Sequence, residues 1–231
     1  MASHWNFRLW GGYQLLALLL FTSWWLGAWQ GIDEALFHLT NEWLRHPSWA
    51  YLVARANQRW VDGAIALTMG LLVLQHAWQT HRGERHYLLL LILLMAGSFS
   101  LQVALGKLLP VERPSPTLVH EMALRVTTLV PDLHTKDASS GSFPSDHGIG
   151  FMTFALFACY RFERRQLVWL LPLLAVLATP RLLSGAHWLS DILCGALPLT
   201  LLVAAWLFHT PLLGWCYRAL DLLPWPKTQV Q

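Results

Sequence analysis

The stretch Tyr87–Leu108, which reads YLLLLILLMAGSFSLQVALGKL, decides the fold class of this chain. Its 22 residues are almost all apolar, and its only charged side chain, Lys107, stands next to its end. About 20 such residues are enough for an α-helix to cross the hydrocarbon core of a bilayer. Inside lipid the backbone must satisfy its own hydrogen bonds, which a helix does within one segment. We therefore predict a transmembrane helix here.

Five further runs on either side of this stretch have the same character. Together the six predict an all-α, polytopic membrane protein with six transmembrane helices, built as a single membrane-embedded domain over residues 1–231 with a C-terminal tail from about 211 to 231. The fourth helix is short, so its N-terminal end is expected in a polar cavity rather than in lipid. The five runs are roughly Gly11–Trp29, Trp60–Trp78, Gly148–Phe162, Leu167–Leu183 and Trp188–Thr210.

The composition of the 231 residues agrees with a membrane domain. Hydrophobic residues make up 55% and charged residues only 13%, whereas a soluble domain carries about 25% charged residues. These values also exclude a disordered chain, which needs low hydrophobicity and high charge. The net charge of +3, with no basic stripe, gives no reason to expect nucleic acid as a partner. The three cysteines form no CxxC pair, so neither a cysteine zinc site nor a disulfide framework is expected.

The short loops set the predicted orientation. Basic residues lie before the first helix, after the sixth helix, and in the loops after the second and fourth helices. In a six-helix protein all four of these regions lie on one side of the membrane. The positive-inside rule makes that side cytoplasmic. The basic residues are Arg8, Arg82, Arg85, Arg161, Arg164, Arg165, Arg218 and Lys227.

Two longer segments face the opposite, outer side in this arrangement. Ile32–His46 has apolar residues at helical spacing, which indicates either an interfacial helix lying along the membrane or a short solvated connector helix. The loop between the third and fourth helices, from about Leu109 to Asp146, is long and polar. Connections of that length are usually functional or disordered.

Charged and proton-transferring side chains from three separate segments are expected to meet at this outer face, because odd helices end there and even helices begin there. Each type has a use in phosphoryl transfer. Lysine and arginine bind phosphate, arginine through two parallel hydrogen bonds, and a hydroxyl with free N–H groups at a helix start binds anions. The residues are Lys107 and Arg113 in the first segment, Ser145 and His147 in the second, and Arg181, His187 and Asp191 in the third.

His187 and Asp191 are four residues apart and therefore share one face of a helix. The carboxylate can accept a proton from one ring nitrogen and aim the other nitrogen at phosphorus, which is the layout of an activated histidine nucleophile. His147 then serves as general acid for the leaving oxygen. No cofactor and no metal are required, since acidic clusters that hold magnesium are missing from this face. Simpler readings are open for each residue. Lys107 can be an anchor that extends its charge to the membrane surface, Ser145 can be the N-cap of a helix, and His187 and Asp191 can form a purely structural pair.

These segments resemble the signature of the phosphatidic acid phosphatase type 2 superfamily, which is Lys-x6-Arg-Pro, then Pro-Ser-Gly-His, then Ser-Arg-x5-His-x3-Asp. The third motif keeps its spacing from Arg181 to Asp191, with Pro180 in place of the leading serine. In the second, Asp146 replaces glycine. The first is one residue short, which puts the role of Lys107 in more doubt than that of Arg113. The resemblance implies His187 as nucleophile, Asp191 as its orienting partner and His147 as acid. It implies that the phosphate is held by Lys107, Arg113, Ser145 and Arg181.

Four strings are similar to one branch of this superfamily, the lipid A phosphotransferases. That resemblance implies transfer of a phosphoryl group from undecaprenyl pyrophosphate to the 1-phosphate of lipid A, at the periplasmic face of the inner membrane. It also makes Lys136 and Asp137 possible acceptor contacts, against the simpler reading of a solvated charge pair. The strings are Ser115-Pro116-Thr117-Leu118, Thr135-Lys136-Asp137-Ala138-Ser139, Ser142-Phe143-Pro144-x-Asp146-His147-Gly148 and Pro180-Arg181-x3-Gly185-Ala186-His187-Trp188.

Two alternatives to the transferase stay open. One is a lipid phosphate phosphatase, which forms the same phosphohistidine but uses water as acceptor; the other is a non-catalytic lipid-binding or transport module. The sequence also leaves open whether polar residues near the start of the second helix belong to the site or to headgroup anchoring. Arg59 and Asp62 are three residues apart there, so a local ion pair is the simpler account. These residues are Arg55, Asn57, Arg59 and Asp62.

Overall fold

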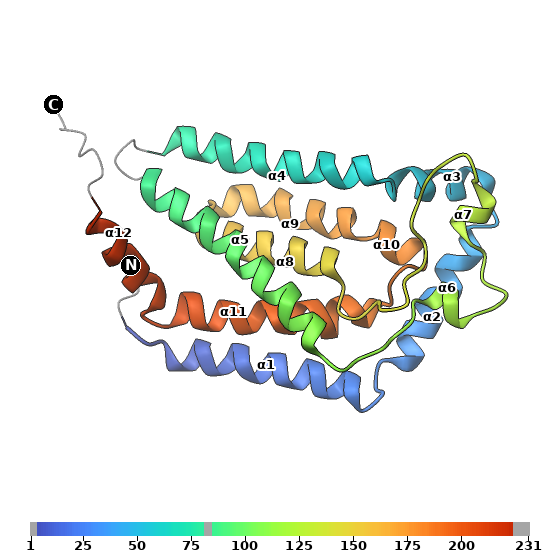
Figure 1. The fold of residues 1–231 in the computed structure, drawn as a ribbon, viewed down its shortest axis with the longest axis horizontal. Helices are drawn as coiled ribbons and strands as arrows, with labels where there is room; N and C mark the ends of the chain where they lie inside the picture. Colours follow the sequence, from blue (N-terminus) through green and yellow to red (C-terminus); the bar gives the residue numbers. More distant parts are fainter. Residues whose placement is uncertain (1–3, 81–84, 224–231) are drawn as a thin grey trace.

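The computed structural model describes residues 4–80 and 85–223, and every regular element in these two ranges is a helix (Figure 1). The predicted all-α fold is thereby confirmed. The elements are α1 (Phe7–Trp25), α2 (Gln30–Trp43), α3 (Pro47–Ala56), α4 (Arg59–Gln79), α5 (Arg85–Leu108), α6 (Pro116–Val119), α7 (Val126–Leu129), α8 (Asp146–Arg161), α9 (Arg164–Ala178), α10 (Pro180–Leu183), the π-helical segment η2 (Asp191–Ala196), α11 (Leu197–His209) and α12 (Leu212–Asp221).

The long helices run side by side as a bundle (Figure 1). Within the described ranges, four helical stretches are long and apolar enough to cross a membrane: α4, α5, Arg164–Leu183 and Asp191–His209. The pair α1 and α2 is a fifth if it counts as one span bent by 76°. Because α8 has only 16 residues, the count of six spans stays a prediction. Arg82, Lys227 and the end of the C-terminal tail lie outside the described residues.

The first run of apolar residues ends earlier than predicted, at Trp25 instead of Trp29. The reason is local: Gly27 adopts a positive φ of 78°, a conformation that glycine reaches without steric penalty and that stops a right-handed helix. The chain then turns into α2, which covers most of the predicted segment Ile32–His46. One face of α2 is buried against the protein, and this face carries Asp33 and Phe37.

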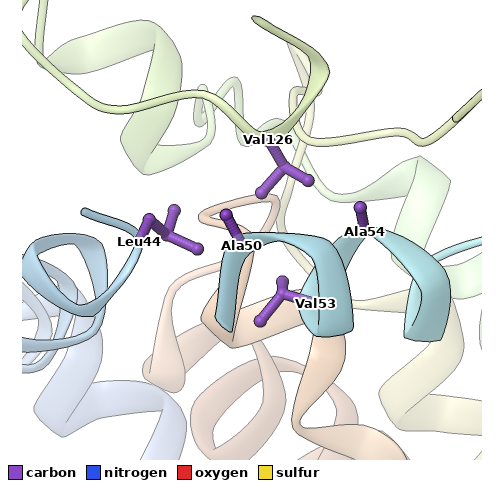
Figure 2. Packing of buried hydrophobic residues seen from close by; sticks show 5 residues of the cluster. All are labelled: Leu44, Ala50, Val53, Ala54 and Val126. Carbon is purple, nitrogen blue, oxygen red and sulfur yellow. The ribbon is translucent and has the colours of Figure 1, made fainter. Parts of the chain in front are cut away.

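The end of the bundle opposite α12 is closed by α2, α3, α6, α7 and α10 (Figure 1). The long loop between α5 and α8 is packed there, with Val126 fully buried against Ala50, Val53 and Ala54 of α3 (Figure 2). Leu44 completes this apolar cluster. The loop is therefore anchored to the helices before it in sequence, and this packing places the residues that follow it.

The segment that leads into α8 is held by close packing around Pro144. A Cβ atom added to Gly106 of α5 would lie 2.6 Å from the Cγ of Pro144, and one added to Gly195 of η2 would lie 2.8 Å from its Cβ. Neither distance is compatible with a larger side chain. The two glycines thus let α5 and η2 approach the proline ring from different sides and determine where α8 begins.

Two hydrogen bonds of one buried side chain join three helices in the interior of the bundle. The fully buried Gln102 of α5 donates to the hydroxyl of Thr153 on α8 at 3.0 Å and accepts from the hydroxyl of Thr200 on α11 at 2.8 Å. In a lipid-facing bundle such interhelical hydrogen bonds take over part of the role that the hydrophobic effect has in water.

Replacing Gln102 by leucine should therefore destabilise the bundle. Both threonine hydroxyls lose their amide partner, and hydrogen bonds of this kind contribute about 0.6–1.7 kcal/mol in membrane proteins. We expect a loss of about 1 kcal/mol in the free energy of unfolding, measured by denaturant titration of the purified protein in detergent. Leu101→Met, at an outward-facing position of the same helix, is the control. A Q102L variant as stable as the wild type would contradict this role.

Candidate active site

His187 lies on the turn between α10 and η2, close to the start of the α8 segment. The turn requires glycine at Gly185, where φ is +72° and an added Cβ would lie 2.7 Å from the methyl group of Thr117. The Nδ1 atom of His187 is 2.9 Å from the carbonyl oxygen of Ser142. A carbonyl only accepts hydrogen bonds, so in the neutral ring Nδ1 carries the proton and Nε2 is left with a free electron pair.

Asp191 is fully buried beside His187, with its Oδ2 atom 3.4 Å from Nδ1 of the ring. The structure brings this predicted pair together, but Ser142 provides the nearer acceptor for the ring N–H. Oδ2 of Asp191 accepts from the backbone N–H of Trp188 at 2.8 Å, and Oδ1 accepts from Arg113 at 2.6 Å. The carboxylate is therefore held rigidly and places negative charge next to the imidazole.

Arg113 is the centre of a buried cluster of charges. One of its terminal nitrogens binds Asp191 and the hydroxyl of Ser190, and the other binds Asp33 of α2 at 2.7 Å. Asp33 also accepts from the backbone N–H of Ser190 at 3.0 Å. The guanidinium lies over the ring of Trp188, 5.1 Å from its centroid, a geometry that favours a cation. The Arg113 side chain is 18% exposed, so part of it is accessible from the protein surface.

A second charge cluster contains the predicted acid. Nε2 of His147, in the first turn of α8, lies 3.2 Å from Arg181 and 3.5 Å from Asp62. Arg181 in turn donates to Asp62 at 2.6 Å. Burial lowers the pKa of His147, and the positive charge of Arg181 lowers it further, while Asp62 acts in the opposite direction. The backbone N–H of His187 donates to the carbonyl of Arg181 at 3.2 Å, so the turn that carries Arg181 links the two histidines.

The expected local pair between Arg59 and Asp62 is wrong. Asp62 contacts Arg181, which is 119 residues away in sequence, because the start of α4 packs next to the turn that carries Arg181. Asn57 belongs to the same junction, since its side-chain amide donates to the carbonyl of Pro180 at 3.0 Å. An acidic residue inside an apolar span was the available signal for Asp62. For Asp33 the sequence held no such signal, since it lies in an ordinary amphipathic helix.

Of the remaining predicted residues, Ser145 and Lys136 adjoin the site, whereas Lys107 and Asp137 do not. Ser145 is buried and caps α8, its hydroxyl accepting from the N–H of Gly148 at 3.2 Å, and the backbone carbonyl of Lys136 lies 3.5 Å from Arg181. Lys107 is exposed and, among the described residues, makes no hydrogen bond or ion pair. Asp137 is turned into the loop.

The buried side chain of Asp137 stabilises the long loop through hydrogen bonds within it. Its carboxylate accepts from Arg125 at 2.7 Å and from both the N–H and the hydroxyl of Thr127 at 2.9 and 2.8 Å. The side chain is 1% exposed. Because both carboxylate oxygens are occupied and buried, the geometry supports a structural role for Asp137 and not a contact with an acceptor.

An apolar cavity of about 800 Å³ begins at the second cluster and extends between α4, α5 and α8. Asp62 and His147 line its polar end, whereas most of its wall consists of side chains such as Met69, Leu74 and Phe99. Cavities that bind small molecules have this character, with a mainly apolar lining and a few placed polar groups. A ligand with a long hydrocarbon chain and a charged head fits this distribution.

Direct contacts join all three predicted segments: Arg113 to Asp191, Ser142 to His187, and Arg181 to His147. Each arginine keeps guanidinium donors beyond those it uses here, so an anion can be bound without dismantling the carboxylate pairs. The result is a site with two imidazoles and two fixed cations, and an apolar cavity opens beside one of the imidazoles, that of His147. Such a site can bind a lipid-linked phosphate and move a phosphoryl group.

The comparisons with known proteins agree with this class of site. The family model described as the PAP2 superfamily matches residues 85–213. The chain therefore belongs to the PAP2 superfamily, a family of membrane lipid phosphatases and phosphotransferases. It is 35% identical over 204 residues to the lipid A 1-diphosphate synthase of Escherichia coli (strain K12), and the match covers 86% of each chain. No solved structure matches it.

Replacing Asp33 by asparagine should destabilise the protein, because it removes one of the two carboxylates that neutralise the buried Arg113. Breaking a buried ion pair from one side leaves an uncompensated charge, and we expect a loss of about 3 kcal/mol in the free energy of unfolding in detergent. Glu42→Gln on the same helix is the matched control. It breaks the pair with Arg45, whose two side chains are 63–66% exposed, and it should leave the stability unchanged. Equal stabilities of D33N and E42Q would refute the buried charge cluster.

Proposed function

We propose that this chain is a lipid A phosphotransferase, which moves a phosphoryl group from undecaprenyl pyrophosphate to the 1-phosphate of lipid A at the periplasmic face of the inner membrane. The observation that carries the chemistry is the environment of His187, whose Nδ1 atom faces the carbonyl oxygen of Ser142 at 2.9 Å beside the carboxylate of Asp191. The similarity to lipid A 1-diphosphate synthase supports the choice of substrates.

In the first step Nε2 of His187 attacks the terminal phosphorus of the pyrophosphate. The P–N bond forms as the P–O bond to the bridging oxygen breaks, and the products are a phosphohistidine and undecaprenyl phosphate. The ring becomes positively charged as it bonds to phosphorus, and the buried Asp191, 3.4 Å from Nδ1, stabilises that charge. A carboxylate next to the ring activates the histidine as a nucleophile while the ring stays in place.

The cations and the second imidazole act on the other atoms of the transferring group. Arg113 and Arg181 stabilise the charge on the equatorial oxygens. His147 donates a proton to the leaving oxygen and thereby stabilises undecaprenyl phosphate as it departs. It then accepts a proton from the attacking acceptor in the second step. The contact between His147 and Arg181 at 3.2 Å supports this division of labour, since it places the acid next to a phosphate-binding cation.

In the second step an oxygen of the acceptor phosphate attacks the phosphohistidine. The P–N bond breaks, the new P–O–P bond forms on lipid A, and His187 returns to its neutral form. The cavity between α4, α5 and α8 is suited to a hydrocarbon chain, and its polar end at His147 supports binding of a lipid pyrophosphate with its head at the two arginines.

A phosphatase that uses water as acceptor is the alternative, because it shares the whole first step. Selecting lipid A over water requires a site that binds the acceptor and keeps water out. The packed loop between α5 and α8 supports the transferase, since it is held against α3 and contacts Arg181 through the carbonyl of Lys136. The identity of the acceptor is therefore the feature to test.

The decisive experiment uses undecaprenyl pyrophosphate labelled in its terminal phosphate, with purified protein and lipid A in detergent. We expect label on lipid A and an acid-labile label on the protein, both lost in His187→Ala and both kept in His134→Ala, a control at an exposed position of the long loop. Loss of the nucleophile should lower the rate at least about a thousandfold. Rapid release of free phosphate that lipid A does not affect would favour the phosphatase instead.

The rate should depend on pH through both histidines. Attack needs a neutral His187 and proton donation needs a charged His147, so we expect a bell-shaped profile of kcat/KM. Asp62 opposes the lowering of the His147 pKa. Asp62→Asn removes that influence and lowers the pKa further, so the limb of the profile that reports His147 moves to lower pH.

Asp132→Asn is the control for this shift, because Asp132 is exposed in the long loop and, among the described residues, has no polar partner. Its profile should coincide with that of the wild type. A D62N profile in which neither limb moves to lower pH would contradict the assignment of His147 as the acid.

A further inference from the structure

A second group of chemically active side chains lies on the outer face of α2, outside the two charge clusters. Glu34 and His38 are one helical turn apart on α2, and His120 approaches them from the end of α6 in the long loop. One ligand atom from each of the three lies within 4.8 Å of the other two. Nε2 of His120 is 2.8 Å and Nε2 of His38 is 3.5 Å from the same oxygen of Glu34.

The contact between His120 and Glu34 is not a hydrogen bond in spite of its length. Nε2 of His120 is shielded from solvent and, within the described part of the chain, has no hydrogen-bond partner of acceptable geometry. The carboxylate oxygen thus lies beside the ring nitrogen and not along the direction of its N–H bond. Two ligands of one metal ion have this relation, because each points at the ion and not at the other ligand.

We infer that Glu34, His38 and His120 form a binding site for one zinc ion, which ties α2 to the long loop. Zinc binds imidazole nitrogen and carboxylate oxygen at about 2.0–2.2 Å, so neighbouring ligand atoms in a tetrahedral site are about 3.3 Å apart. The two separations of 2.8 and 3.5 Å bracket this value. Two imidazoles and one carboxylate favour zinc over magnesium or calcium, which prefer oxygen ligands alone.

Contacts outside the three ligands hold the site in place. The side-chain amide of Asn41 donates to the carbonyl of Leu124 at 2.8 Å and accepts from its N–H at 3.0 Å, which holds the loop against α2. The ring of His120 is stacked on Phe37, with 5.0 Å between the centroids and 15° between the planes. A ligand with a fixed ring orientation loses little entropy on binding.

The position of this site links it to the charge cluster around Arg113 without making it part of the reaction. Glu34 adjoins Asp33 in sequence, and the ring of His120 lies 6.1 Å from that of Trp188, which is the neighbour of His187. Zinc at this site therefore has a structural effect: it fixes the loop segment 115–124 relative to α2.

Zinc binding is tested with the full chain in detergent, purified through a tag without histidine, stripped with a chelator and then equilibrated with Zn²⁺. Mass spectrometry of the bound metal should give one equivalent per chain, lost in His38→Ala and in His120→Ala and kept in His134→Ala. His38 is the safer substitution for folding, since its side chain is 65% exposed. Excess Mg²⁺ should not displace the ion.

Hydrogen exchange then tests the link between α2 and the loop. Zn²⁺ should slow exchange of the amides in residues 118–124 in the wild type and leave His38→Ala unchanged. Neither measurement uses a lipid substrate, so the outcome is independent of the proposed transferase activity. Absence of a bound equivalent in the wild type, or retention of it in both histidine variants, would overturn the zinc site.

Discussion

The buried pairing of Arg113 with Asp33 and Asp191 is the interaction on which the rest of the structure depends. It joins three segments that are far apart in sequence: α2, the loop after α5, and η2. Charged groups in a protein interior are tolerated only where partners compensate them, so this contact requires all three segments in one arrangement. That arrangement also places His187, whose turn immediately precedes η2, against the segment that leads into α8.

The charges at the end of the bundle opposite α12 form two clusters, one beside each histidine. Arg113 and Asp191 lie beside His187, whereas Arg181 and Asp62 lie beside His147. In both clusters an arginine and a carboxylate are paired, so the site is preorganised for an anion without an unpaired buried charge. The apolar cavity opens from the second cluster alone. In the proposed reaction, a lipid headgroup bound there lies next to His147, and its terminal phosphate extends toward His187.

The helices and the local motif spacing could be predicted from the sequence, whereas contacts between distant side chains could not. The helices followed from apolar runs, because a helix in lipid depends mainly on the length and hydropathy of one segment. The spacing of Arg181, His187 and Asp191 was readable for the same reason, since it is local. Asp33 was missed and the partner of Asp62 was assigned wrongly, because their contacts with Arg113 and Arg181 bridge 80 and 119 residues. Periodicity carries no information over such separations.

The sequence by itself determined an all-helical, membrane-embedded class of protein and the residue types of a phosphoryl-transfer site, because hydropathy and motif spacing are properties of short segments. Only the tertiary structure decided which carboxylate pairs with which arginine, where α2 turns away from α1, and that the carbonyl of Ser142 faces the ring of His187. These features arise where segments pack against each other. A buried polar group binds whichever partner the packing brings within hydrogen-bond distance, and that partner is seldom near in the chain.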